Sequence, residues 1–517
     1  MTALRRLLLP LTLVLALVAL AGCGSTPSAT GDADPAAWAP AGAPVYIEAS
    51  IRPGEPLKSS VDSVIGKVSL RKDWRAQLIA KINSSSKQGA TFEKDIDPWL
   101  GNRVGVFVTG PVIGRKPLYA VIIGVRDEKK LKDQVDSNRL GGKSGTRSGS
   151  YKDTSYRIAP NGTATGVVKG SLVVGTEPGL RKVIDVSKGA PSLSSDPAFG
   201  KAKSRAAAQR LALMYFDPRR LLDLAPQGGT RSAQLQQLKA LPGFANAKPV
   251  AVALGATPNS ITFESTVERA ANAAAASSAK RTPLFDELPG DSWAALGVGG
   301  FGDRVKCTLS TLLGAGAPGA SLAQIESLVR ARTGLELQRD LLGWIGDVAF
   351  FLRGTSTSNL SGALVLSSKD PAVSTAAVGR IGKAIGRLAN RPTTPVSIAG
   401  ARGFSVPTKG SGQPVLMVAR GDRVVIAYGL ASAQEALKPS RRLGDSAELQ
   451  KAKSALGSGL DPTFYVGVAP ILKLVESAGS SPKLQQALPY LRAYQFLVAG
   501  GQRSGNVGHS KLIIGLR

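Results

Sequence analysis

The chain repeats itself, and this internal repeat restricts the possible fold more than any other feature of the sequence. The segment around Trp99 (EKDIDPWLGNRVGVF) resembles the segment around Trp344 (ELQRDLLGWIGDVAF). The tetrapeptide KAKS begins at Lys201 and again at Lys451. Matches in one order, 245 to 250 residues apart, are typical of a tandem duplication.

The repeat also predicts the domain organisation. A chain of 517 residues exceeds the usual size of one hydrophobic core, so two domains are expected. The two copies place a first domain at residues 35–267 and a second at 284–517. Residues 268–283 are rich in alanine and have no apolar stripe to bury, so we interpret them as a linker.

Helical and strand periodicities both occur within each copy. Apolar residues at helical spacing predict helices around 61–68 and 322–329, the second with Ser321 and Gln324 as a capping box. Strand-like runs follow one another before a helix arrives. This favours an α+β fold with a largely antiparallel sheet and packed helices in each of two homologous domains. The predicted strands are 104–108, 118–125, 167–174, 261–267, 348–352, 362–366, 415–419 and 511–516.

The first 34 residues carry the pattern of an exported lipoprotein. Two arginines precede an apolar stretch at residues 7–20, which is shorter than the about 20 residues of a membrane span. The sequence LAGC then ends at Cys23. We expect residues 1–22 to be a signal peptide, Cys23 to be lipidated through a thioether, and residues 23–34 to form a flexible tether. The alternatives are an ordinary secreted protein and an N-terminal membrane helix.

Lipidation of Cys23 predicts a location at the cell membrane, on its extracytoplasmic face. Two acyl chains hold a protein on a bilayer durably, whereas one chain does so marginally. The second cysteine, Cys307, then has no partner for an intrachain disulfide. Cys307 alternates with Val305 and Leu309, which predicts a strand with a small packed side chain at this position.

The positive charge of the chain indicates which partners to expect. The net charge is +29, and the basic excess is spread over both copies. Outside a cell membrane the abundant polyanions are anionic lipid headgroups and wall polymers rather than nucleic acid. The alternative is that the charge serves general solubility.

One predicted helix could contact such a surface. In residues 371–388, Arg380, Lys383 and Arg387 share a face at i, i+3 and i+7, next to an apolar face. We consider two interpretations, contact with anionic headgroups and a solvated helix surface whose isoleucines pack on the sheet.

Patterns that would indicate catalysis are missing from the sequence. Cys307 and the single histidine, His509, argue against a Cys/His zinc site and against histidine-based catalysis. Asp95 and Asp97 lie close in sequence, but paired carboxylates alone do not define a glycosidase. We therefore expect no cofactor, no metal and no enzymatic activity. The matched tryptophans either stack on a ligand or fasten a loop to each sheet.

Three features together resemble a known family. These are LAGC, the phrase WAPAGAPVY that begins at Trp38, and the sequence DPWLG that begins at Asp97. They are similar to those of the DUF3352-like proteins, extracytoplasmic and often lipidated, of high-GC Gram-positive bacteria. The resemblance implies the same location and architecture and carries no activity or ligand.

These observations predict a membrane-anchored, non-catalytic lipoprotein with a binding or envelope-maintenance role. Two other functions remain open at this point. Two similar lobes are also found in the solute-binding component of an importer, and a hydrolase with an unrecognised acidic site would fit the location.

Overall fold

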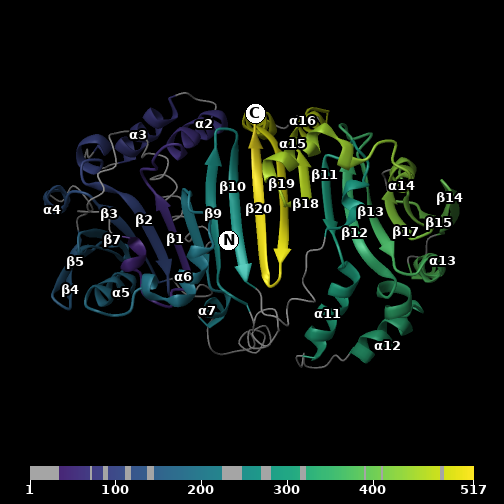
Figure 1. Ribbon diagram of the computed structural model, residues 1–517, viewed down its shortest axis with the longest axis horizontal. Coiled ribbons are helices and arrows are strands. Elements are labelled where there is room, and N and C mark those ends of the chain that lie inside the picture. Colours follow the sequence, from purple (N-terminus) through teal and green to yellow (C-terminus); the bar gives the residue numbers. More distant parts are fainter. Residues whose placement is uncertain are drawn as a thin grey trace. The chain divides into compact units, whose positions relative to one another are not determined.

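The computed structural model describes residues 34–69, 73–85, 91–110, 118–136, 145–223, 247–268, 281–314, 322–388, 392–408, 412–477 and 482–517. The predicted signal peptide, Cys23, the tether before Asp34, residues 269–280 of the predicted linker and Ser321 lie outside this set. The chain forms two compact units, called unit 1 and unit 2, with the boundary after Glu268 (Figure 1). Within the described residues, every helix is too short or too polar to cross a bilayer.

Unit 1 contains an antiparallel sheet, as the strand-like runs predict. Neighbouring strands in the sheet are, in order, β10 (Ser260–Glu268), β9 (Val250–Thr257), β8 (Ala212–Phe216), β1 (Val45–Ser50), β2 (Leu100–Val108), β3 (Tyr119–Val125), β7 (Ser171–Thr176), β6 (Thr163–Val168), β5 (Thr154–Ile158) and β4 (Arg147–Tyr151).

The first helix of unit 1 precedes β1, and the others lie between strands in the sequence. The helices are η1 (Pro35–Ala37), α2 (Leu57–Ser69), α3 (Trp74–Ser85), the π-helical turn η2 (Phe92–Ile96), α4 (Glu128–Asp136), α5 (Glu177–Ser187), η3 (Leu193–Ser195), α6 (Pro197–Ser204) and α7 (Pro218–Asp223).

The strands of unit 2 pair in the corresponding order, and this pairing is again antiparallel. The neighbours are β20 (Val507–Leu516), β19 (Tyr494–Ser504), β18 (Asp461–Gly467), β11 (Ala294–Val298), β12 (Ile345–Arg353), β13 (Ser361–Ser368), β17 (Arg423–Tyr428), β16 (Val415–Arg420), β15 (Ala401–Val406) and β14 (Thr394–Ile398).

Helices of unit 2 follow a matching order along the chain. They are α10 (Pro283–Asp286), α11 (Phe301–Gly314), α12 (Leu322–Thr333), the π-helical turn η5 (Leu337–Leu342), α13 (Pro371–Leu388), α14 (Leu430–Leu437), η6 (Leu443–Asp445), α15 (Ala447–Leu456), α16 (Val468–Ser477) and α17 (Pro482–Leu491). The mixed α+β fold with antiparallel pairing is therefore confirmed.

Each sheet carries an apolar cluster on both of its faces, because successive strand residues point to opposite faces. In unit 2 one cluster joins Phe351 and Val425 to the small helices around Phe285. The other joins Trp344, Phe404 and helix α13. The apolar helix faces are buried against the sheet. Each Å² of apolar surface removed from water stabilises the fold by about 25 cal/mol, which holds the layers together.

Two local predictions are wrong. Residues 167–174 form two strands, β6 and β7, because Lys169 and Gly170 have φ values of 46° and 72° and close a tight hairpin turn. Cys307 lies on helix α11 with an exposed side chain, not in a strand. Helix α12 forms as predicted, but none of its residues is buried and Leu328 is 53% exposed.

Candidate functional site

The predicted basic face lies on helix α13, whose bounds agree with the prediction. Its three cations differ in their surroundings. The Arg380 Nε lies 2.7 Å from the Asp340 Oδ1, and Arg387 donates to the backbone oxygen of Thr333 at 3.2 Å. Lys383 is exposed. The structure therefore commits Arg380 to a contact within unit 2 and leaves Lys383 and Arg387 on the surface.

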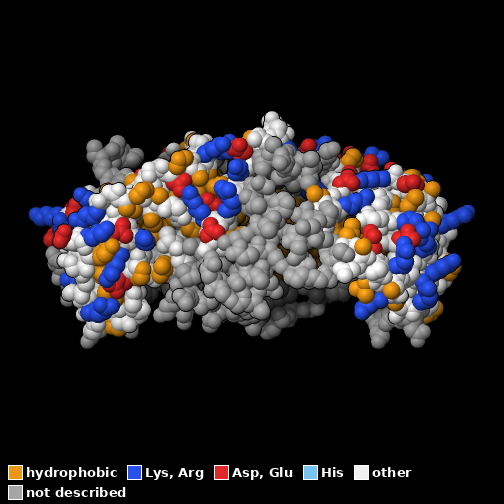
Figure 2. Space-filling model, turned by 90° about the horizontal axis from the view of Figure 1, so that it is seen from below, with side chains coloured by type: hydrophobic (Ala, Val, Ile, Leu, Met, Phe, Trp, Pro, Cys, Tyr) orange, Lys and Arg blue, Asp and Glu red, His pale blue; other side chains and the backbone are white. Residues whose placement is uncertain are grey.

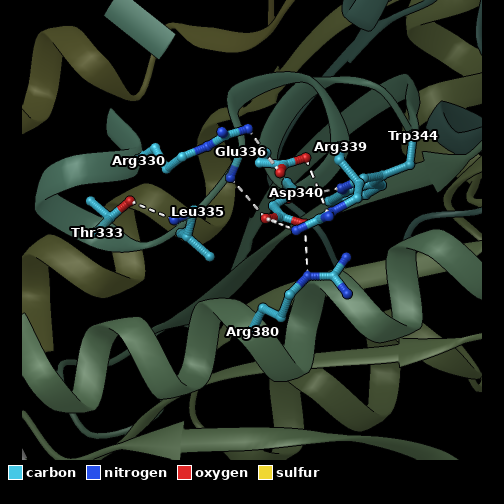
Figure 3. A network of polar contacts seen from close by, with 8 residues as sticks. All are labelled: Arg330, Thr333, Leu335, Glu336, Arg339, Asp340, Trp344 and Arg380. Atoms are coloured by element: carbon cyan, nitrogen blue, oxygen red, sulfur yellow. Dashed lines mark hydrogen bonds and ion pairs between the residues drawn. The ribbon is translucent and has the colours of Figure 1, made fainter. Parts of the chain in front are cut away.

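Asp340 is the centre of a polar network that the sequence did not reveal. Its side chain is fully buried, although Asp340 lies in the short turn η5. Figure 3 shows the carboxylate between the guanidinium groups of Arg339 and Arg380, and the Glu336 N–H donates to it at 2.8 Å. The network ties η5 to helix α13.

The ionisation of Asp340 follows from these contacts. Burial alone would raise the pKa of the carboxyl group, because it disfavours the charged form. Hydrogen bonds from two guanidinium groups and one backbone N–H outweigh burial, so the pKa lies below its ordinary value. Asp340 is therefore ionised at neutral pH and acts as a structural anion.

The matched tryptophans belong to the same turns. Trp344 and Trp99 are 2% and 3% exposed. Each indole N–H donates to a backbone oxygen four residues earlier, that of Asp340 at 3.1 Å and that of Asp95 at 2.6 Å. Both rings are thus buried against their own π-helical turns, which favours the loop-fastening interpretation over ligand stacking.

Asp95 and Asp97 of unit 1 also have structural partners. Asp95 is 3% exposed and accepts a hydrogen bond from the Thr91 N–H at 2.7 Å. Asp97 pairs with Arg52 at 2.6 Å. The two carboxylates therefore have separate structural partners. Within the described ranges, no group of three or more His, Cys, Asp or Glu side chains could hold a metal ion.

A second buried carboxylate, Glu48, lies near the start of the described chain. It is 3% exposed and lies 3.2 Å from a guanidinium nitrogen of Arg103 and 3.2 Å from the hydroxyl of Tyr46. Burial and the neighbouring carboxylates raise the pKa of Tyr46 well above its ordinary value. Asp34, predicted as the last residue of the tether, caps η1 and pairs with Lys203 at 3.0 Å, so it belongs to the folded unit.

An apolar groove on the sheet of unit 2 is the clearest candidate for a binding site. Its volume is about 370 Å³, which is within the range of about 300–1,000 Å³ that small-molecule sites occupy. The groove lies over β12, β13, β17 and β16. Its main side chains are all half-buried: Phe350, Leu352, Leu364, Val415, Ile426 and Tyr428.

The groove continues into an apolar row that crosses five strands. In the strand register, each residue of this row lies opposite the next one on the neighbouring strand. Their order is Phe464, Leu296, Phe350, Leu364 and Ile426. Leu296 is 43% exposed, which is unusual for a large apolar side chain in the middle of a sheet. Only alternating apolar residues are visible in the sequence here, and alternation does not tell whether a face is covered.

The same row in unit 1 is more deeply buried. Val106 and Val121, which occupy the register positions of Phe350 and Leu364, are 5% and 2% exposed. They belong to a cluster to which helix α3 contributes Ile79 and helix α4 contributes Leu131. The open groove is therefore a feature of unit 2 and not a general consequence of this strand order.

The fold and these contacts define a two-unit α+β protein with an apolar surface groove and structural ion-pair networks. The family model described as "Protein of unknown function (DUF3352)" matches residues 7–497, so the chain belongs to the DUF3352 family.

No curated protein matches this chain. Among solved structures, crystal form IV of TP0453 matches at 12% identity and a TM-score of 0.25, covering 46% of this chain and 80% of that one. Crystal form I of TP0453 matches at 13% identity and a TM-score of 0.25, covering 48% and 81%.

Proposed function

We propose that this chain is a membrane-anchored extracytoplasmic lipoprotein that acts by binding rather than by catalysis. The groove of unit 2 carries the proposal, because an apolar concave surface of this size costs free energy while it faces water. The described carboxylates at the centres of the polar networks are held by structural partners, which does not favour a hydrolase.

The location rests on the sequence. The charged start, the apolar stretch at 7–20 and LAGC support cleavage after Gly22 and lipidation of Cys23. About ten tether residues would then place Asp34 within roughly 20 Å of the membrane surface. We also propose that units 1 and 2 arose by tandem duplication, which the repeat and the matching strand orders support.

A thermal-shift screen of the full-length chain tests the binding function. Solutes, lipids and wall fragments are compared on the wild type, on Leu364→Trp, which fills the groove, and on Leu328→Trp as a control. Leu328 is 53% exposed on helix α12. A ligand at 100 times its Kd stabilises the folded state by about 2.7 kcal/mol.

We expect a ligand that raises the Tm of the wild type and of Leu328→Trp but not that of Leu364→Trp. A polar solute with this behaviour would favour the importer component, and turnover of a wall fragment would favour the hydrolase. An equal shift in all three proteins would reject the groove as the binding site.

Helix α13 is a second surface for which we propose contact with anionic lipid headgroups or wall polymers. Figure 2 shows Lys and Arg side chains dispersed among other kinds over the described parts of one face, so any such attraction depends on particular helices. Arg380 is held by Asp340, which leaves Lys383 and Arg387 for the contact.

Reversal of both surface charges tests this contact. In a Cys23→Ala background, Lys383→Glu with Arg387→Glu is expected to weaken sedimentation with anionic vesicles, because each nearby cation contributes about 1 kcal/mol. Binding to neutral vesicles should not change. If the double variant binds anionic vesicles like its parent, helix α13 is a solvated surface.

A further inference from the structure

We propose that the groove of unit 2 binds one acyl chain of a membrane phospholipid. This inference rests on the proposed function, in which the groove is the binding site, and it adds the chemical class of the ligand. The argument uses the lining of the groove, the hydrogen bonding of its floor, the cover of the sheet and the position of its polar groups.

The lining selects an apolar ligand. Six half-buried side chains, five of them purely hydrocarbon, form the walls, and Tyr428 is the sixth. No lining residue carries a formal charge. A ligand with polar groups along its length would lose its hydrogen bonds to water in this groove without replacement.

The floor of the groove does not allow an extended peptide to bind by strand addition. Strand β12 pairs with β11 and β13, strand β13 pairs with β12 and β17, and strand β17 pairs with β13 and β16. Their backbone groups are therefore used within the sheet, and no strand edge is available to a peptide backbone. A hydrocarbon chain has no donors or acceptors to satisfy, so it fits this floor.

The size of the groove argues against a folded protein as the occupant. Stable protein–protein interfaces bury roughly 1,200–2,000 Å² in total. A groove of about 370 Å³ over four strands is on the scale of a small molecule.

The helices next to the sheet leave the groove open. In unit 1, α2 packs against β9, and Ser63 and Lys67 bond to the backbone oxygen of Pro258 at 2.8 and 2.9 Å. In unit 2, α11 packs instead against β12, η5 and α12, and no residue of α12 is buried. The apolar face that α3 and α4 help to cover in unit 1 is thus accessible in unit 2.

The polar side chain of the groove lies at one end. Tyr428 is the last residue of β17, opposite Gly362 in the neighbouring strand. We place the headgroup end of the lipid here, where the Tyr428 hydroxyl can contact an ester oxygen. The open side, beside Leu296, lets a single chain of a two-chain lipid enter sideways.

Photo-crosslinking of the full-length chain tests this inference. The probe is phosphatidylglycerol in vesicles, with a diazirine in one acyl chain, and crosslinked peptides are identified by mass spectrometry. We expect crosslinks within β12, β13 and β17 (residues 345–353, 361–368 and 423–428). Leu364→Trp should reduce them about tenfold, which corresponds to 1.4 kcal/mol, and Leu328→Trp should leave them unchanged.

A second groove-filling variant, Val415→Phe on β16, provides the same test if Leu364→Trp does not fold. Circular dichroism shows whether each variant is folded. Crosslinks outside the groove, or equal yields in folded filling variants, would overturn the inference. So would labelling of the groove by a diazirine fatty acid but not by the phospholipid.

The outcomes also distinguish failure of the acyl-chain inference from failure of the proposed binding function. If a soluble ligand shifts the Tm through Leu364 while the phospholipid probe does not label the groove, the acyl-chain inference fails and the binding function stands. If neither occurs, both fail.

Discussion

Replacing Asp340 by alanine is expected to destabilise unit 2 by about 3 kcal/mol, near the lower end of the range for broken buried ion pairs. The substitution removes the acceptor of the Glu336 N–H and of two guanidinium groups. Arg380 retains 35% side-chain exposure and can hydrate again, which keeps the cost from reaching the upper end of the range. Helix α13 and turn η5 lose the contact that joins them.

Denaturant unfolding of the full chain, with the transitions of the two units analysed separately, measures this effect. The matched control is Asp303→Ala, which removes a pair between Lys369 and a side chain that is 66% exposed. The control should change the free energy of unfolding by less than about 1 kcal/mol. Equal losses of unfolding free energy in both variants would show that the buried Asp340 network stabilises unit 2 no more than an exposed ion pair does.

The pH dependence of stability provides an independent check on Asp340. The pKa of its carboxyl is lowered in the folded state, so the unfolded state binds the proton more readily. The stabilisation is therefore complete above the unfolded pKa, about 3.9, and is lost as pH falls through the folded value. Asp340→Ala should unfold with a smaller dependence on pH below about 4.

Substitution of Cys23 by alanine is expected to move the protein out of the membrane fraction or to leave it unprocessed. Without the thioether the chain carries no diacylglycerol, so it loses both of the acyl chains that would hold it durably on the bilayer. Fractionation followed by immunoblotting measures the change, and the mobility of the band reports on processing.

Cys307→Ala is the matched control, because it removes the other cysteine, which lies exposed on helix α11. It should fractionate like the wild type. Membrane association of Cys23→Ala with normal mobility would reject lipidation at Cys23.

Much of the fold was predictable because its signals are local. Alternating apolar residues located strands such as β2, β12 and β20, and the bounds of helix α13 agree with residues 371–388. The errors arose where one pattern fits two structures. Val305, Cys307 and Leu309 alternate like a strand, but their segment forms helix α11, in which Val305 and Leu309 also have helical spacing.

The candidate sites depend on contacts that a sequence pattern does not contain. Asp340 is buried because Arg380, 40 residues away, reaches it from another element. Leu296 and Phe350 alternate like any sheet residues, and their exposure is set by where α11 and α12 pack. The Lys169–Gly170 turn did carry a local signal, since glycine readily takes a positive φ.

A membrane location underlies both the headgroup contact of helix α13 and the acyl-chain ligand of the groove. Mass spectrometry of the N-terminal peptide, isolated from the native membrane, tests that location directly. We expect a peptide that begins at Cys23 and carries the mass of a diacylglyceryl thioether. A peptide that retains residues 1–22, or that begins with an unmodified Cys23, would contradict a lipid-anchored binding protein.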